Sequence, residues 1–171
     1  MKHIFTLLLS FTLSFASFDT LNTFQADFTQ SVTDDKNESL IYKGHITASK
    51  PQNALWEYTT PIKKDVYINR FSVTLIEPEI EQVIIRKIES NFDFFSMVRN
   101  AKKIENNKYI ANYKESEFII ITKNSLIKSI SYVDEFDNKV KIVFENQKQN
   151  EKVNPELFVP RYPLEFDVIR D

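Results

Sequence analysis

The sequence predicts a mainly β (α+β) fold, an antiparallel barrel or a strongly curved sheet, from two features of the chain. Short alternations of apolar and polar residues recur along most of its length, and turn residues separate them, as in proteins built from half-buried antiparallel strands. The chain also holds 15 Phe and 7 Tyr among 171 residues. So many aromatic side chains in so short a chain predict either a bulky core or a large apolar cavity.

Three strands with a period of two are expected in the first third of the chain. A half-buried strand turns alternate side chains to the same face of the sheet, so apolar residues two apart mark its buried face. A turn at residues 50–53 separates the second strand from the third. The residues that share a face are Phe24, Ala26 and Phe28 in the first strand, Gly44, Ile46, Ala48 and Lys50 in the second, and Ala54, Trp56 and Tyr58 in the third.

A hairpin and four more strands are expected further along. Apolar alternations flank a turn at residues 69–70, with Val66 and Ile68 before it and Phe71, Val73 and Leu75 after it. The other strands are expected at residues 108–113, 117–122, 126–133 and 139–147.

Three helical segments interrupt this pattern. Residues 90–99 are the best supported, because Ser90 and Asp93 fit the S-x-x-D capping box and a strongly apolar stretch follows. The apolar residues of this helix are Phe92, Phe94, Phe95, Met97 and Val98. A short helix is also expected over residues 17–23, and Asn154 is expected to start a further helical turn.

The N-terminus is typical of a secretory signal peptide over residues 1–16. Lys2 and His3 precede an apolar run at residues 4–15, and Ser14 and Ala16 provide the small residues of a cleavage site. A membrane-spanning helix needs ~20 apolar residues, so this run is too short to be a stable anchor. We therefore expect an exported chain whose mature part, residues 17–171, is a single domain.

The composition argues against most catalytic and metal-binding sites. The sequence has no cysteine and one glycine, Gly44, which excludes disulfides, thiolate sites and glycine-rich phosphate loops. After signal cleavage His45 is the one remaining histidine, too few for a histidine-rich metal site. A net charge of −2, without clustered Lys or Arg, does not fit a nucleic-acid surface. We expect neither an enzyme nor a bound cofactor.

The order and spacing of several short motifs resemble the LolA family of periplasmic lipoprotein carriers. Residues 24–30, FQADFTQ, are similar to the family's F-x-A-x-F-x-Q opening strand. The second match has the spacing G-x5-[RK]-P-x4-W-x-[YM]-x2-P and runs from Gly44 to Pro61. Further similar positions are Pro78, Glu81 and Gln82, then Asp134, Asn138, Ile142, Phe144 and Asn146, and finally Leu157, Phe158, Pro163, Asp167, Val168 and Ile169.

This resemblance implies an unclosed antiparallel β half-barrel with short helices forming a lid over an apolar cavity. It implies a periplasmic monomer that accepts acylated lipoproteins from an inner-membrane lipoprotein-releasing ABC transporter and passes them to an outer-membrane receptor lipoprotein. Neither bond-making nor a cofactor is required. A periplasmic lipid- or glycolipid-binding sensor of the same fold, without a delivery role, is the alternative. A receptor relative is disfavoured because the chain has no cysteine to acylate, and a secreted hydrolase comes last.

These interpretations assign roles to particular residues. The family commonly has Arg where Lys50 stands, a position that tethers the lid, so Lys50 is the expected lid or gating residue. Asn37 lies in D-K-N-E-S, which resembles the acidic sequon of bacterial N-glycosylation. The expected ligand-binding residues are Phe24, Phe28, Ile46, Ala48, Ala54, Trp56, Tyr58, Val73, Leu75, Phe92, Phe95 and Val98.

Overall fold

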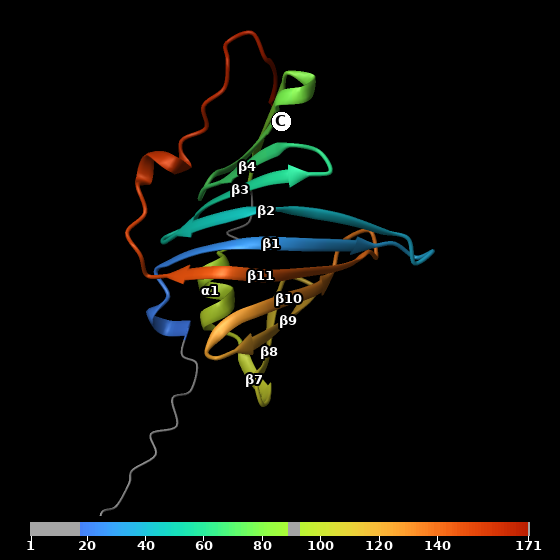
Figure 1. Cartoon of the computed structure of the whole chain (residues 1–171), viewed down its shortest axis with the longest axis vertical. Helices are drawn as coiled ribbons and strands as arrows, with labels where there is room; N and C mark the ends of the chain where they lie inside the picture. The colour runs from blue at the N-terminus through green and yellow to red at the C-terminus, as the bar shows by residue number, and fades with distance from the viewer. Residues whose placement is uncertain (1–17, 89–92, 171) are drawn as a thin grey trace, which may run out of the picture.

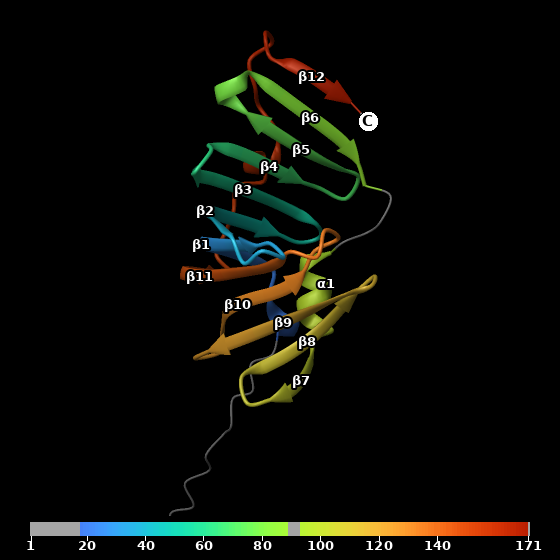
Figure 2. The same ribbon diagram turned by 90° about the vertical axis from the view of Figure 1, so that its right-hand side faces the viewer.

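One open sheet of 12 strands organises the chain, with the order β12-β6-β5-β4-β3-β2-β1-β11-β10-β9-β8-β7 (Figures 1 and 2). The structure, a computed structural model, describes residues 18–88 and 93–170. The strands are β1 (Thr23–Thr33), β2 (Ser39–Ser49), β3 (Asn53–Thr60), β4 (Lys64–Ile68), β5 (Ser72–Glu77), β6 (Gln82–Lys87), β7 (Lys102–Glu105), β8 (Lys108–Tyr113), β9 (Ser116–Lys123), β10 (Leu126–Val133), β11 (Lys139–Gln149) and β12 (Asp167–Arg170).

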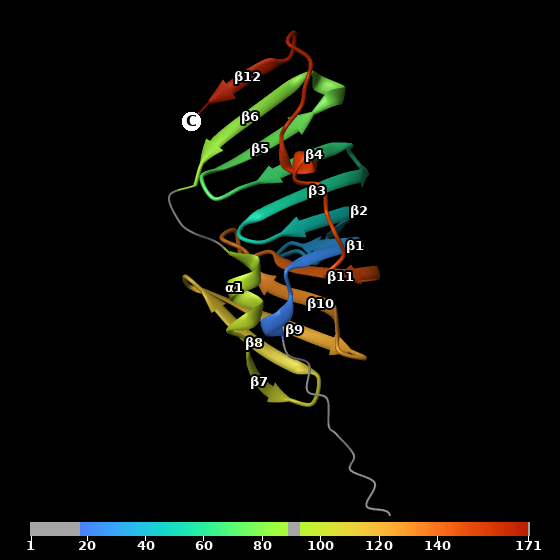
Figure 3. The ribbon, with the colours of Figure 1, turned by 90° about the vertical axis from the view of Figure 1, so that its left-hand side faces the viewer.

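The mainly β, unclosed fold expected from the sequence is confirmed, with one correction to the pairing. Adjacent strands are antiparallel except β12, which runs parallel to β6. The chain leaves β11 in the middle of the sheet and passes β1 to β4 before it reaches this far edge (Figures 1 and 3). This long connection, residues 150–166, makes the parallel pairing possible, because parallel neighbours require a crossover segment.

The helical parts are shorter than expected. The α-helix, α1 (Phe94–Arg99), begins at Phe94, and the Asp93 side chain caps it by accepting a hydrogen bond from the Phe95 amide at 3.0 Å. Asp93 is thus the N-cap residue, in place of the expected Ser90; Ser90 and Phe92 lie outside the described residues. Near the N-terminus a 3-10 turn, η1 (Phe18–Thr20), replaces the helix expected over residues 17–23, because Thr23 already belongs to β1.

Two further 3-10 turns complete the secondary structure. The turn expected at Asn154 is confirmed as η3 (Pro155–Phe158), where the Asn154 side chain accepts a hydrogen bond from the Glu156 amide at 3.1 Å. The other, η2 (Pro78–Ile80), connects β5 to β6. The expected signal peptide, residues 1–16, lies outside the described residues.

Two separate cores form on opposite faces of the sheet. We call the face that α1 covers the inner face and the opposite face the outer face (Figures 2 and 3). The inner core includes Phe24, Ala26 and Phe28 of β1, Ile46 and Ala48 of β2, Ile142 and Phe144 of β11, and Phe95, Met97 and Val98 of α1. The outer core consists of Thr47, Leu55, Thr74, Ile76 and Val83, all buried.

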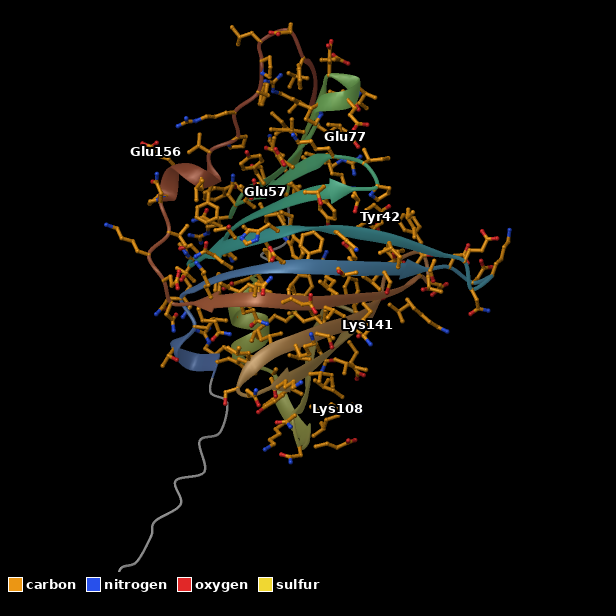
Figure 4. All side chains as sticks on the ribbon, in the orientation of Figure 1. Tyr42, Glu57, Glu77, Lys108, Lys141 and Glu156 are labelled. Carbon is orange, nitrogen blue, oxygen red and sulfur yellow. The ribbon has the colours of Figure 1, made fainter. Side chains whose placement is uncertain are left out.

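The segment between β11 and β12 accounts for the outer core. η3 packs on β3, and Phe158, Tyr162 and Phe166 of this segment are half-buried. Away from this segment, the outer face is exposed to solvent at Glu57 on β3 and at Lys141 on β11 (Figure 4). The outer core is therefore confined to the strands that the C-terminal segment passes.

Gly44 allows the three central strands to approach closely. A Cβ atom at this position would overlap the carbonyl oxygen of Glu57 on β3 and would lie 2.9 Å from Cζ of Phe28 on β1. The β2–β3 register shifts between Lys43 and Gly44, so the strand is irregular here. The missing side chain leaves the space over β2 that the Phe28 ring occupies, which is the usual reason for glycine inside a strand.

Candidate ligand-binding cavity

An apolar cavity of about 260 Å³ lies between the inner face of the sheet and α1. Its walls come from β1 to β4, from β9 to β11 and from the helix, so residues far apart in the sequence meet around it. The lining residues are Gln30, Ile46, Ala48, Gln52, Asn53, Ala54, Trp56, Tyr58, Val66, Ile68, Phe94, Phe95, Met97, Phe118, Ile130, Tyr132, Ile142 and Phe144. None of them carries a formal charge, which suits an uncharged apolar ligand.

Aromatic rings form the wall on the β3 side. The Phe28 ring packs edge-on against Trp56 and against Tyr58, with centroids 5.0 Å apart in both pairs. Trp56 and Tyr58 stack on each other at 6.4 Å. Alternation along β3 directs both side chains to the inner face, and Gly44 leaves room for Phe28 between the strands. Such ring contacts fix the wall in one arrangement without ligand.

The helix forms the opposite wall. Phe94, Phe95 and Met97 of α1 line the cavity, and Phe95 and Met97 are buried. The Phe94 ring lies 5.8 Å from the ring of Phe24 on β1 and 5.5 Å from that of Phe95. A helix of six residues has little stability of its own, so packing and the Asp93 cap hold it in place.

The polar end of the cavity is built around Tyr58. Its hydroxyl donates a hydrogen bond to Oε1 of Gln30 at 3.0 Å. Burial, and then the neighbouring Tyr132 and Tyr42, raise the pKa of Tyr58 well above its ordinary value, so the phenol stays neutral and acts as a donor. Lys64 lies outside the cavity lining, next to two aromatic rings. Its Nζ is 4.8 Å from the ring centroid of Tyr58 and 5.1 Å from that of Tyr42, and Tyr42 is labelled in Figure 4.

Half of the residues expected to bind ligand line this cavity. These are Ile46, Ala48, Ala54, Trp56, Tyr58 and Phe95. Phe24, Phe28 and Val98 are buried behind the lining, in the inner core. They support the rings and the helix of the cavity wall, and their contact with ligand stays a prediction.

The other expected binding residues lie elsewhere. Val73 and Leu75 pair with Ile68 and Val66 and share the inner face with them, but they are half-buried and outside the lining. Phe92 lies outside the described residues. Whether Val73 and Leu75 contact ligand stays a prediction.

Lys50 lies at the edge of the fold and not on a strand face as expected. β2 ends at Ser49, and Lys50 begins the turn to β3. Its Nζ donates a hydrogen bond to Oδ1 of Asn22 at 3.2 Å, and its amide donates to the Asn22 carbonyl oxygen at 2.9 Å. Asn22 follows η1, and η1 packs on α1. Lys50 thus supports the N-terminal turn, and its role in gating stays a prediction.

The lining residues that the sequence interpretation missed come mostly from the C-terminal half. Ile142 and Phe144 of β11 alternate with Lys141 and Glu145 and carry a clear period of two. The missing information was pairing: β11 lies beside β1, with Phe144 opposite Phe28. Gln30, Gln52 and Asn53 have no local signal, since polar residues at strand ends and turns are usually solvated.

Other features expected to matter lie away from the cavity. His45 is on the outer face, where its Nδ1 lies 2.8 Å from Oδ1 of Asp27. Asn37 is exposed in the β1–β2 turn with a φ of 63°, and its modification stays a prediction. Within residues 18–88 and 93–170, no three His, Cys, Asp or Glu side chains gather in a way that would hold a metal ion. The same residues include no helix long and apolar enough to cross a membrane.

The family model and the sequence relatives identify one family, and a solved structure shares the fold. The family model described as "Outer membrane lipoprotein carrier protein LolA" matches residues 19–117. The outer-membrane lipoprotein carrier protein of Campylobacter jejuni is 40% identical over 149 residues, which cover 87% of each chain. The protein of the same name from Wolinella succinogenes is 27% identical over 159 residues, 92% of each chain. An uncharacterized conserved protein from Thermus thermophilus has a similar fold, with a TM-score of 0.54 at 13% identity over 89% of this chain and 92% of that chain.

Proposed function

Because this chain belongs to the LolA family, we propose that it is a lipoprotein carrier that shields acyl chains in the cavity between the sheet and α1. The observation that supports this role is the cavity itself, with uncharged walls of aromatic and aliphatic side chains. The family consists of carriers and not of enzymes, and the proposed role requires no bond to form or break.

Burial of acyl chains supplies the binding free energy in this proposal. Each methylene group that leaves water contributes ~0.8 kcal/mol, so a long chain is held strongly even without polar contacts. A cavity of about 260 Å³ is smaller than most small-molecule pockets, which enclose ~300–1,000 Å³. Several acyl chains therefore need more room than this arrangement provides.

We propose that α1 acts as a lid and supplies that room by moving away from the sheet. The helix has six residues and one side-chain cap, so its displacement breaks few hydrogen bonds. The half-open inner face of β4 and β5, with Val73 and Leu75, continues the apolar wall next to Val66 and Ile68. Acyl chains that displace α1 would extend over this surface.

The delivery pathway follows from the same proposal. In the periplasm a monomer would accept acylated lipoproteins from an inner-membrane lipoprotein-releasing ABC transporter and pass them to an outer-membrane receptor lipoprotein. Transfer down a gradient of affinity is sufficient, because ligand release requires only that the receptor bind acyl chains more tightly. Neither step involves a cofactor.

Native mass spectrometry of the protein purified from the periplasm of its own host tests this function. We expect a complex whose added mass matches an acylated polypeptide. Depletion of the protein should also leave outer-membrane lipoproteins in the inner membrane. A bound lipid without a polypeptide, together with normal lipoprotein sorting after depletion, would instead identify a lipid-binding sensor.

We propose that Lys50 supports the lid indirectly, through Asn22 and η1. Lys50→Arg adds donors in a planar fork, which should tighten this corner and slow hydrogen exchange in residues 94–99. Unchanged exchange in α1, with the fold intact by circular dichroism, would limit Lys50 to the support of the N-terminal turn.

A further inference from the structure

The Gln52 side chain carries a buried acceptor without a donor. Gln52 lies in the turn between β2 and β3 and lines the cavity. Among the described residues, Oε1 of Gln52 is the buried side-chain oxygen or nitrogen without a hydrogen-bond partner. An unpaired buried acceptor costs ~1–3 kcal/mol, and native proteins rarely keep one without a use for it.

The position of Gln52 indicates what that use is. The same side chain also lines a second cleft, of about 310 Å³, between α1 and β8. The polar residues of this cleft are Asp93, Ser96, Asn100 and Asn112. Asn100 and Asn112 are exposed, so the cleft leads to solvent. Gln52 therefore stands where an apolar cavity meets a polar exit.

A ligand that spans this boundary must be apolar on one side and polar on the other. An acylated polypeptide has this form, because its acyl chains join a peptide whose amide N–H groups are donors. Acyl chains and their ester groups have no donor to offer Gln52. Gln30 also has an amide side chain in the cavity wall. Its Oε1 already accepts a hydrogen bond from the Tyr58 hydroxyl, at the other end of the cavity.

We propose that Gln52 is a specificity-determining residue whose Oε1 accepts a hydrogen bond from an amide N–H at the junction of acyl chain and polypeptide. The polypeptide then leaves the protein through the cleft beside Asp93, Ser96 and Asn100. This inference depends on the proposed carrier function and adds to it a means to distinguish acylated polypeptides from other lipids of equal chain length.

Two matched ligands test the proposal. One is an N-palmitoyl dipeptide, and the other is its depsipeptide analogue, in which an ester oxygen replaces the N–H of the acyl amide. Binding is measured by titration of the fluorescence of Trp56, the single tryptophan, which lies in the cavity wall. We expect the unmodified protein to bind the amide about 5- to 10-fold more tightly, the effect of one net hydrogen bond.

Gln52→Met removes the acceptor and keeps a side chain of similar length. We expect this variant to bind both ligands equally, with an affinity for the depsipeptide within about twofold of the unmodified protein, because apolar contacts are retained. Its melting temperature should not fall, because the unpaired acceptor is gone. Gln52→Leu provides the same readout if methionine disturbs the packing. The matched control, Gln25→Met, makes the same change on the outer face of β1, away from the cavity, and should keep the preference for the N-palmitoyl ligand.

The possible outcomes separate this inference from the carrier function. Equal binding of both ligands by the unmodified protein would overturn the role of Gln52 and would leave the carrier function intact. A preference that survives in both Gln52 variants would also overturn it. Failure to bind either ligand would contradict the carrier function and this inference together.

Discussion

Two regions of the sheet, the middle around β1 and β11 and the part around β5 and β6, are protected from opposite sides. Around β1 and β11 the inner face is buried under α1, with Phe24 0% exposed, while Asp27 on the outer face is exposed. Around β5 and β6 the arrangement is reversed. Ile76 and Val83 of the outer face are 3% and 0% exposed under the C-terminal segment, while Leu75 on the inner face is half-buried.

This reversal shows how an open sheet can have a stable core and still present an apolar surface. Each of the two regions gains its stability from one covered face, against which another element packs. Because the C-terminal segment stabilises β5 and β6 from outside, their inner face does not have to be covered. That face remains available next to the cavity, on the side away from α1.

Truncation of one side chain in each core should produce the largest losses of stability in the two regions. Phe24→Ala removes a ring that packs on Phe94 and Phe144 and should lower the free energy of unfolding by ~3–5 kcal/mol. Ile76→Ala in the outer core should lower it by ~2–5 kcal/mol. Urea denaturation measures both values.

Hydrogen exchange then shows whether the two cores are independent. Phe24→Ala should increase exchange in residues 94–99, because α1 loses the ring on which Phe94 packs. Ile76→Ala should leave α1 protected, since it lies on the other face of the sheet. Equal loss of protection in both variants would mean that the two cores unfold as one unit.

The sequence predicts most of the sheet, and the three missed strands have physical reasons. β6 contains Val83, Ile84 and Ile85 in succession. Its outer face is buried and its inner face is partly buried, so apolar residues occupy both faces and the period of two is lost. β7 is exposed at all four positions and has no buried face to mark it. β12 has four residues and is defined by its pairing with β6, which local sequence does not encode.

Gly44→Ala should have the next largest effect, because it disturbs β2, which lies between the two regions and contacts both β1 and β3. The new methyl group would overlap the Glu57 carbonyl oxygen and press on the Phe28 ring. Overpacking of this kind costs ~1–3 kcal/mol, and a backbone neighbour places the variant at the upper end. The midpoint of urea denaturation measures this loss. His45→Ala, on the exposed outer face of the same strand, serves as the control and should change stability by less than ~1 kcal/mol.

On the strands, the binding site is predicted from sequence only where the alternation of one strand decides it. Ala54, Trp56 and Tyr58 were identified in this way because Leu55 is the single apolar residue on the opposite face of β3. On β5 both faces are apolar, with Val73 and Leu75 on one and Ile76 on the other, so the pattern cannot tell which face is covered. Only the path of the C-terminal segment decides which face of β5 is covered.

Leu75→Ser tests whether the open inner face takes part in binding. The side chain is half-buried and outside the cavity lining, so the free energy of unfolding should fall by only ~1 kcal/mol. We expect weaker binding of long-chain acyl peptides and unchanged binding of short-chain ones, because only long chains extend past the cavity. Trp56 fluorescence titration with the two chain lengths measures the difference. Equal affinities in Leu75→Ser and the unmodified protein for both lengths would confine the ligand to the cavity.

The smallest effect is expected on the outer face of β1, where nothing covers the sheet. Hydrogen bonds from Asn146 (2.7 Å) and His45 (2.8 Å) lower the pKa of Asp27 below its ordinary value of 3.8. A carboxyl whose pKa is lower in the folded state contributes stability above pH 3.8, and this contribution is lost as the pH falls through the folded-state pKa. Because the Asp27 side chain is 53% exposed, the contribution should stay below ~1 kcal/mol. Melting temperatures between about pH 5 and 2 should therefore fall slightly more steeply for the unmodified protein than for Asp27→Asn. Asn146→Ala, which removes the stronger of the two hydrogen bonds, should lie between them. Identical curves for all three proteins would show that Asp27 adds nothing to the acid stability of this exposed face.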